Sequence, residues 1–321
     1  MMKTQNLSDT RLPETPHIVV VGAGAMGCIF GGKLSQAGNR VTLIDVNPEQ
    51  IKIMNERGLM LEMDHGTISV PATAALATQV KEVADILILF TKTLHTEAAL
   101  NSVQHLIGES TIVVSLQNGL GNAEKISRYV PQERIVIGTT LVPADLKGPG
   151  HVASHGPSSS QFMDVELKHP RWLDDLVELF NQAELNVSLN DSIMSVIWSK
   201  VAFNAALNAI CAGTGATPGV LDGDKAFQAL AHDVVHEAVI IGQLSGVELD
   251  EAKIWGNVQM AIAEHANHKP SMLQDIEAGR KTEIAAINGA IVTAAEKVGS
   301  EAPVNRTLTY IVQLKEHLNG Q

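Results

Sequence analysis

The stretch HIVVVGAGAMGCIFGGKLSQAG, residues 17–38, decides the fold class of this chain. It opens with an apolar, β-branched run typical of a buried strand and continues with the spacing of a helix that ends at Gly38. Glycines between them permit a tight turn, let backbone approach a pyrophosphate, and let the helix pack on the strand. The start of the helix also offers unpaired N–H groups to an anion. We therefore predict a dinucleotide site formed by Gly22, Ala23, Gly24, Ala25, Met26 and Gly27, with a purely structural glycine turn as the alternative.

Apolar runs with helical stretches between them continue through the first half of the chain. Such runs are typical of strands buried on both faces of a parallel sheet, and the alternation indicates βαβ units. After Pro143 the sequence is rich in turn residues with short alternating runs, which predicts an antiparallel extension, followed by a helix over residues 171–184. The strands that we expect lie at residues 17–22, 40–45, 84–91, 111–117 and 134–142.

The second half reads as helical throughout, with no convincing strand beyond Asn190. The fold class that we predict is α/β, with an N-terminal Rossmann-type dinucleotide-binding domain followed by an all-α C-terminal domain. Its parts are a flexible tail over residues 1–16, the dinucleotide-binding domain over 17–190 and a helical substrate and dimerisation domain over 191–321. Helical periods in the second domain cover residues 192–212, 224–245, 250–267, 272–298 and 304–318.

Composition excludes several classes of function. The net charge of −12 over 321 residues argues against a general affinity for nucleic acid or anionic membranes. Cys28 and Cys211 match no metal or redox spacing, and His232 with His236 lack a third ligand, so we expect no metal site. Residues 1–16 lack the apolar core of a signal peptide, and no uninterrupted run approaches a membrane span. We expect a cytoplasmic protein.

Three side chains at strand ends are candidates for cofactor contact. Asp45 closes the second strand, where a carboxylate can accept ribose hydroxyls of NAD and repel the 2′-phosphate of NADP. Its alternatives are a solvated strand end or an N-cap for the next helix. Lys92 and Asn118 follow later strands at the same edge, although Asn118 in QNGLG also fits a plain turn. We expect NAD(H) to be preferred, with NADP(H) possible.

The helix SVIWSKVAFNAALNA, residues 195–209, carries an unusual polar stripe. Lys200, Asn204 and Asn208 lie at i, i+4 and i+8 among residues that favour burial. An apolar environment lowers the pKa of a lysine towards the range useful for proton transfer, and carboxamides can bind a polar ligand without adding charge. A lysine whose charged end reaches water, on a solvated helix face, is the alternative.

A second stretch, PSMLQDIEAGRKTEIAAING, residues 270–289, can supply a partner for the lysine. Ser271 and Gln274 fit a capping box after Pro270, and the rest fits an amphipathic helix. Glu283 stands among isoleucines, so its carboxylate needs a partner, and Lys200 is a natural candidate.

These motifs, in this order and spacing over residues 17 to 316, resemble the ketopantoate reductase family. The resemblance implies that Lys200 is the general acid and that Glu283 positions or polarises the active site. It further implies cofactor contact by Lys92, and substrate or nicotinamide contact by Asn118, Asn204, Asn208 and Ser271. The implied reaction is reduction of 2-dehydropantoate, a branched 2-oxo acid, to the (R)-2-hydroxy acid.

Two departures from the family pattern resemble a branch of NAD-dependent D-2-hydroxyacid dehydrogenases of the D-mandelate or D-2-hydroxyisocaproate type. IDVNP, residues 44–48, lacks the basic residue that accompanies NADPH in many family members, and His268 stands where the family often has asparagine. His268 is therefore a further candidate for substrate contact. The remaining alternative is a dinucleotide sensor without catalysis, and the apolar helices of the second domain make a homodimer our expectation.

Overall fold

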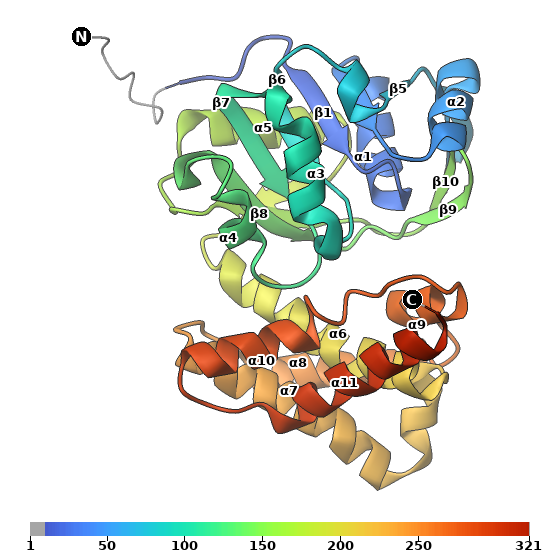
Figure 1. Ribbon diagram of the computed structural model, residues 1–321, viewed down its shortest axis with the longest axis vertical. Helices are drawn as coiled ribbons and strands as arrows, with labels where there is room; N and C mark the ends of the chain where they lie inside the picture. Colours follow the sequence, from blue (N-terminus) through green and yellow to red (C-terminus); the bar gives the residue numbers. More distant parts are fainter. Residues whose placement is uncertain (1–9, 321) are drawn as a thin grey trace. The chain divides into compact units, whose positions relative to one another are not determined.

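The structure is a computed structural model that describes residues 10–320, and it divides into two compact units. Unit 1 comprises the chain up to Gln117 together with Asn122–Ile193, and unit 2 comprises Asn118–Gly121 together with the chain from Met194 onward (Figure 1). The short loop 118–121 thus belongs to the helical unit although it follows a strand of unit 1. Of the predicted tail, residues 1–9 lie outside the described residues, and the backbone N–H of Leu12 donates to Asp175 at 3.0 Å.

The main sheet of unit 1 has the strand order of a doubly wound nucleotide-binding fold. Its order is β12-β11-β8-β7-β6-β1-β2-β5, with β1 parallel to both β2 and β6. The chain reverses its direction of winding at β1, so the carboxyl ends of β1 and β6 form the switch point where such folds bind ligands. The parallel strands are β1 (His17–Val21), β2 (Arg40–Ile44), β5 (Thr73–Ala75), β6 (Ala84–Leu89), β7 (Ile107–Ser115) and β8 (Ile135–Thr140). The five predicted strands are confirmed, and the short β5 is additional, as are two strands at residues 59–63 and 66–70.

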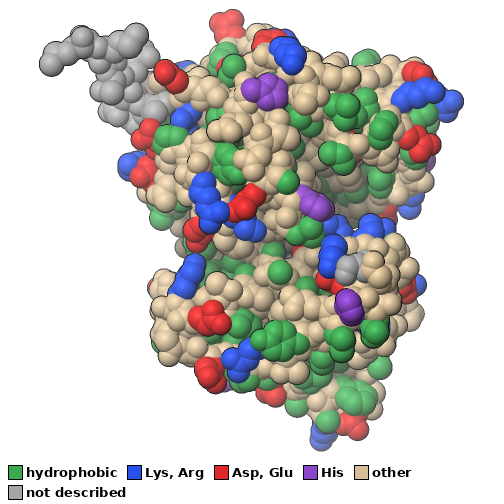
Figure 2. Space-filling model, viewed as in Figure 1, with side chains coloured by type: hydrophobic (Ala, Val, Ile, Leu, Met, Phe, Trp, Pro, Cys, Tyr) green, Lys and Arg blue, Asp and Glu red, His purple; other side chains and the backbone are tan. Residues whose placement is uncertain are grey.

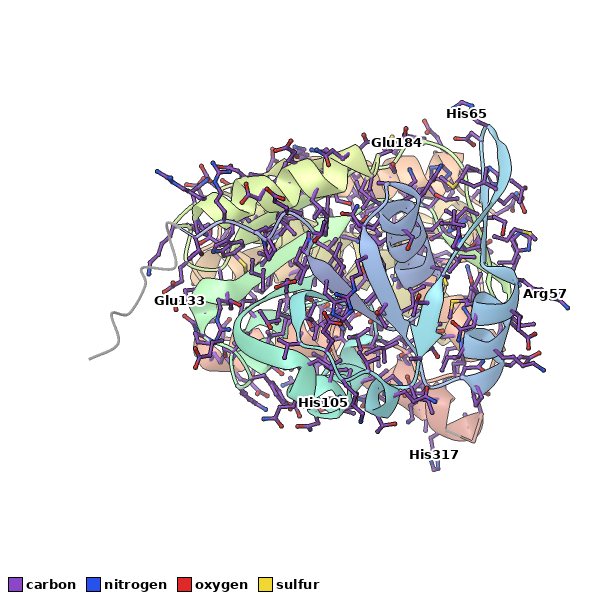
Figure 3. All side chains as sticks on the ribbon, turned by 90° about the horizontal axis from the view of Figure 1, so that it is seen from above. Arg57, His65, His105, Glu133, Glu184 and His317 are labelled. Carbon is purple, nitrogen blue, oxygen red and sulfur yellow. The ribbon has the colours of Figure 1, made fainter. Side chains whose placement is uncertain are left out.

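The predicted antiparallel extension is also confirmed. β11 (Ser160–Asp164) pairs antiparallel with β8, and β12 (Val187–Leu189) extends the sheet beside it. A second sheet has the order β4-β3-β10-β9. Its strands are β3 (Leu59–Met63), β4 (Gly66–Val70), β9 (Asp145–Gly148) and β10 (His151–Ser154), and Figure 3 shows the labelled His65 at the turn between β3 and β4.

Helix α1 (Ala25–Gln36) lies between the two sheets. A Cβ on Gly31 would stand 2.7 Å from Leu43 of β2, and one on Gly32 would stand 2.9 Å from Leu61 of β3. The predicted helix over residues 171–184 is confirmed as α5. The other helices of unit 1 are α2 (Pro48–Arg57), α3 (Thr96–Val103), α4 (Asn122–Ile126) and α5 (Arg171–Gln182).

Unit 2 is helical in all its described elements and is built around α6. Alanines on α6 are fully buried, which lets other helices approach its backbone closely. One predicted element is wrong: the helix expected over 272–298 is two helices, because Gly279 has a φ of 63° and the chain turns through residues 278–287. The helices are α6 (Ile193–Thr214), α7 (Lys225–Leu244), α8 (Glu251–Glu264), α9 (Ser271–Glu277), α10 (Asn288–Lys297) and α11 (Pro303–Leu318).

Among residues 10–320, one helix, α6, is long and apolar enough to span a membrane by length and composition alone. The expectation above concerned uninterrupted apolar runs, which is a stricter criterion. In its apolar window 56% of the helix is buried inside the structure, as it is for the core helix of a globular unit.

Candidate functional site

The glycine loop of unit 1 has backbone geometry that other residues could not adopt. Gly22 has a φ of 99°, and a Cβ there would lie 2.8 Å from the backbone nitrogen of Thr91. A Cβ on Gly27 would lie 1.9 Å from the carbonyl oxygen of Gly22. Gly24 is exposed, and a Cβ there would meet nothing within 4 Å. The backbone therefore leaves no room for side chains at Gly22 and Gly27, whereas space is left around Gly24.

The N-terminus of α1 is open to an anion. Gly24 is its N-cap and no side chain caps it, and the first turn holds no acidic residue. The backbone N–H groups of Ala25 and Met26 therefore begin the helix without a competing carboxylate. Together with the space above Gly24, this arrangement fits a dinucleotide pyrophosphate.

Asp45 holds the glycine loop through backbone hydrogen bonds. Its Oδ2 accepts the N–H of Ala23 at 2.8 Å, and its Oδ1 accepts the N–H of Asn47 at 2.9 Å. The alternative that Asp45 caps α2 is wrong, because Asn47 is the N-cap. Since each carboxylate oxygen accepts more than one hydrogen bond, these contacts leave acceptor capacity towards a ribose.

Lys92 lies directly after β6, at the switch point, and is partly buried. The neighbouring backbone is held by Gln117, whose Nε2 donates to the carbonyl of Thr91 at 2.6 Å and to the hydroxyl of Thr96 at 2.9 Å. Sequence reasoning missed Gln117, and also Gln50, whose Nε2 donates to the carbonyl of Ala23 at 2.8 Å. A buried amide at the end of an apolar strand was the available signal for Gln117.

In unit 2 the polar stripe of α6 points away from free solvent. Lys200 and Asn204 are partly buried, and Asn208 is only 7% exposed. Burial lowers the pKa of Lys200 to about 8, although the negative charge of Glu283 acts in the opposite direction. An ordinary solvated face is therefore excluded at Lys200 and Asn208.

Glu283 lies in the turn between α9 and α10, not on a helix as expected. The preceding Thr282 is buried and anchors this turn, because its backbone N–H donates to Glu316 of α11 at 2.8 Å and its hydroxyl donates to the same oxygen at 2.5 Å. Glu283 is partly buried beside Asn118, whose Nδ2 donates to Glu283 Oε2 at 3.2 Å.

The loop 118–121 packs against the same turn. Gly119 has a φ of 89°, and the N–H of Leu120 donates to the carbonyl of Ala286 at 3.0 Å. Unit 2 therefore brings together Asn118, Lys200 and Glu283, of which two lie 165 residues apart in the chain.

Ser271 and His268 are both exposed at the start of α9. The predicted capping box is wrong, since Pro270 is the N-cap and Gln274 Nε2 donates to the carbonyl of Lys269 at 2.9 Å.

The cysteines and histidines outside this group offer no second chemical centre. Cys28 is buried, its thiol donates to the carbonyl of Ala23 at 3.1 Å, and burial raises its pKa to about 12. His232 and His236 both face Glu251, yet no group of three or more residues in the described part of the chain could hold a metal ion.

Comparisons with known proteins agree with this architecture. The family model described as "Ketopantoate reductase PanE/ApbA" matches residues 18–166, and its C-terminal counterpart matches residues 192–316. The chain is 34% identical over 301 residues to the 2-dehydropantoate 2-reductase of Streptococcus pyogenes, covering 93% of this chain and 97% of the relative. It is also 34% identical over 304 residues to that of Pyrococcus horikoshii, covering 94% and 98%.

Solved structures show the same fold. D-Mandelate dehydrogenase in complex with NADH and anilino(oxo)acetate is 31% identical, with a TM-score of 0.90 over 95% of this chain and 100% of that chain. A PanE/ApbA family ketopantoate reductase from Ralstonia eutropha is 28% identical, with a TM-score of 0.87 over 95% and 100%. Both halves of the sequence match one family, and this chain belongs to the ketopantoate reductase family.

Proposed function

We propose that this protein reduces a branched 2-oxo acid to the (R)-2-hydroxy acid with NAD(P)H, and that 2-dehydropantoate is the first substrate to test. The observation that carries the proposal is the group Lys200, Glu283 and Asn118 in unit 2, where burial lowers the pKa of the lysine to about 8. A lysine with such a pKa can both hold and release a proton near neutral pH.

The cofactor-binding residues of the proposal are those of the glycine loop with Asp45 and Lys92. Gly22, Gly24 and Gly27 leave the N-terminus of α1 accessible to the pyrophosphate, and Asp45 accepts from the ribose hydroxyls. Lys92 supplies a positive charge for a phosphate, or an N–H donor for a ribose hydroxyl. When bound, the dinucleotide supplies the hydride that adds to the carbonyl carbon.

Lys200 supplies the proton that balances this hydride. As the carbonyl oxygen gains negative charge, the ammonium donates a proton from Nζ, which gives the hydroxyl group and a neutral amine. The carboxylate of Glu283 favours the charged form of Lys200, because its attraction raises a pKa that burial lowers. Asn118 donates to Glu283 and so orients the carboxylate.

The substrate carboxylate and chain are assigned to neutral polar groups. Asn204 and Asn208 present carboxamides on the same face of α6 as Lys200 and can bind oxygen atoms without adding charge. Ser271 and His268 complete the proposed set from the start of α9, where both side chains are exposed. Their role requires a substrate that reaches that surface.

A second candidate function is an NAD-dependent D-2-hydroxyacid dehydrogenase. It is supported by Asp45, a carboxylate at the end of β2, and by the 31% identity to a D-mandelate dehydrogenase solved with NADH. The dinucleotide sensor remains the alternative without catalysis, and the presence of both Lys200 and Glu283 argues against it.

A panel of 2-oxo acids, read as loss of absorbance of NADH or NADPH, tests the proposal. The panel contains 2-dehydropantoate, 2-oxoisovalerate, 2-oxoisocaproate and phenylglyoxylate. We expect turnover with at least one of them, and Lys200→Ala should lower kcat by about 10²- to 10⁴-fold, the range of a lost general acid. Glu283→Ala should also lower kcat, and the double variant should be far from additive, because the two groups act together. Cofactor oxidation by none of the acids would contradict the enzymatic function.

We also propose that the protein is a homodimer. The helix α11 exposes an apolar stripe of Tyr310, Ile311, Leu314 and Leu318, with Tyr310 63% and Leu318 75% exposed. Their spacing places them along one side of the helix. Figure 2 shows apolar side chains among charged ones on the face of unit 2 where α11 lies in Figure 1. A second copy of this chain is the occupant that we propose for the stripe.

A further inference from the structure

Two buried asparagines connect the turn that carries Glu283 to the helix that carries Lys200. Asn288, the first residue of α10, and Asn305 of α11 are both fully buried. Asn288 Nδ2 donates to the carbonyl of Ala205 at 3.2 Å and to Asn305 Oδ1 at 3.0 Å. Ala205 lies near the middle of α6, between Asn204 and Asn208.

The direction of the hydrogen bonds between these residues is determined by two acceptors on α7, the carboxylate of Glu237 and the carbonyl of Val234, which accepts from Asn305 Nδ2 at 3.2 Å. The carboxylate of Glu237 accepts from the backbone N–H groups of Val304 and Asn305, and from Asn305 Nδ2 at 2.9 Å. A carboxylate only accepts, so Asn305 must turn its NH₂ towards Glu237 and its oxygen towards Asn288. Asn288 must then present its own NH₂, and that group reaches Ala205.

The contact with Ala205 acts on α6 as a whole. The carbonyl of a residue inside a helix accepts one hydrogen bond from the N–H group four residues later, and its second lone pair can accept another. A donor held by α10 and α11 therefore fixes both the rotation and the axial position of α6. Lys200, Asn204 and Asn208 move with that helix.

The other end of the contact moves with Glu283. Between Glu283 and Asn288 the backbone forms successive tight turns, in which the N–H groups of Ala286 and Ile287 donate to the carbonyl of Glu283 at 2.9 and 3.1 Å. The N–H of Gly289 donates to the carbonyl of Ile284 at 2.9 Å. A displacement of Asn288 is therefore passed to Glu283 through a short, hydrogen-bonded segment.

Both hydrogen bonds of the Asn288 side chain are donated by its Nδ2. A leucine would fill a similar volume, but it would break the contact with Ala205 and leave the buried Asn305 Oδ1 without this donor. The donor group of Asn288, and not only its volume, therefore links α10 to α6.

We propose that Asn288 is a positioning residue, which sets the separation of Lys200 and Glu283 by tying the Glu283 turn to the carbonyl of Ala205 on α6. The orientation of its amide is imposed through Asn305 by Glu237 and the carbonyl of Val234. This proposal rests on the proposed function for its consequence in catalysis, whereas the separation itself can be measured without turnover.

The first experiment measures the interaction between Lys200 and Glu283 by NMR titration of the Lys200 side chain in the intact protein, assigned with Lys200→Arg. In the otherwise native chain Glu283→Gln should lower the Lys200 pKa by about 1 unit, as loss of a nearby opposite charge does. In the Asn288→Leu chain the same substitution should change that pKa by less than half as much. An equal change in both chains would overturn the proposal.

Two further variants separate positioning from general loosening. Val258→Ala removes fully buried volume from α8 without touching these hydrogen bonds, and it should leave the interaction between Lys200 and Glu283 unchanged. Asn288→Ala removes the same donor with a smaller side chain, so it should weaken the interaction even if Asn288→Leu fails to fold. An unchanged interaction in a folded Asn288→Ala protein contradicts the proposal equally.

The catalytic consequence is measured separately. Asn288→Leu should lower kcat about tenfold or more and leave the dissociation constant for the dinucleotide unchanged, because that site belongs to unit 1. Val258→Ala should keep kcat within about twofold. If the native protein turns over no 2-oxo acid, the proposed function fails, while the NMR titration still decides the role of Asn288.

Discussion

Lys200 is a residue whose acid–base chemistry the fold changes strongly. Its ordinary pKa of 10.5 is lowered to about 8 by burial, while Glu283 raises it and limits the fall. The same side chain on a solvated helix would stay charged across the physiological range. Environment, and not residue type, makes this lysine suitable for donating a proton.

The pH dependence of turnover follows from that value. A general acid must be protonated, so kcat for reduction should be constant below pH 8 and fall about tenfold per unit above it. For oxidation of the hydroxy acid the neutral amine is required, and kcat should instead rise to a plateau above pH 8. Measurements of kcat against pH in both directions check this. Glu283→Gln should shift the midpoints of both pH profiles to lower pH. Parallel profiles in the two directions would exclude Lys200 as the group that titrates.

Asp45 determines the predicted cofactor preference. Its carboxylate would repel the 2′-phosphate of NADPH, so we expect a higher kcat/KM with NADH. Asp45→Asn keeps the shape of the side chain but removes its charge. The ratio of kcat/KM with NADH to kcat/KM with NADPH should then fall about tenfold, because the 2′-phosphate is no longer repelled. Kinetics with both cofactors check it, with Asp64→Asn, a carboxylate elsewhere in unit 1, as the control. A native preference for NADPH would show that the carboxylate does not act on the ribose.

At the scale of elements, α1 and the turn between α9 and α10 place the chemical groups. Helix α1 is packed on both sides, so its N-terminus keeps one position relative to β1 and β6. Because residues 278–287 form a turn, Glu283 does not lie on a helix, and its carboxylate accepts a hydrogen bond from Asn118. Each element is held by close backbone contacts that glycines allow.

Substitution of two glycines should separate the loop's geometry from its ligand contacts. Gly27→Ala places a Cβ 1.9 Å from the Gly22 carbonyl oxygen, so it should distort the loop, abolish dinucleotide binding and lower the melting temperature. Gly24→Ala meets no protein atom within 4 Å, and it should weaken dinucleotide binding while leaving the melting temperature nearly unchanged. Calorimetry of binding and of unfolding checks both. Equal destabilisation by the two substitutions would show that the loop differs from this description.

At the scale of the whole molecule, the two units carry separate tasks. The glycine loop, Asp45 and Lys92 belong to unit 1, and Lys200, Glu283 and the loop 118–121 belong to unit 2. Variants of the proton donor are therefore expected to spare dinucleotide affinity. The exposed stripe on α11 is the surface that we propose for a third task, which is self-association.

The oligomeric state tests that third task. Leu314→Glu places a charge in the middle of the stripe, where the side chain is 59% exposed, and it should convert a dimer into a monomer of unchanged fold. Leu146→Glu on β9, also an exposed leucine at 46%, is the matched control and should leave the mass unchanged. Analytical ultracentrifugation measures both. A native protein that sediments as a monomer at micromolar concentration would rule out the proposed dimer.

The sequence by itself determined the features that depend on local periodicity and on glycine. The strands of the parallel sheet, the loop at Gly22–Gly27 and the polar stripe on α6 all follow from residue spacing within a few turns of chain. The tertiary structure alone decided that Asn118 belongs with the helical unit, that Glu283 lies in a turn, and that Asn288 reaches Ala205. The physical reason is that these contacts join segments 83 to 165 residues apart, where no periodic pattern specifies a partner and only the packing of whole elements brings the groups within hydrogen-bonding distance.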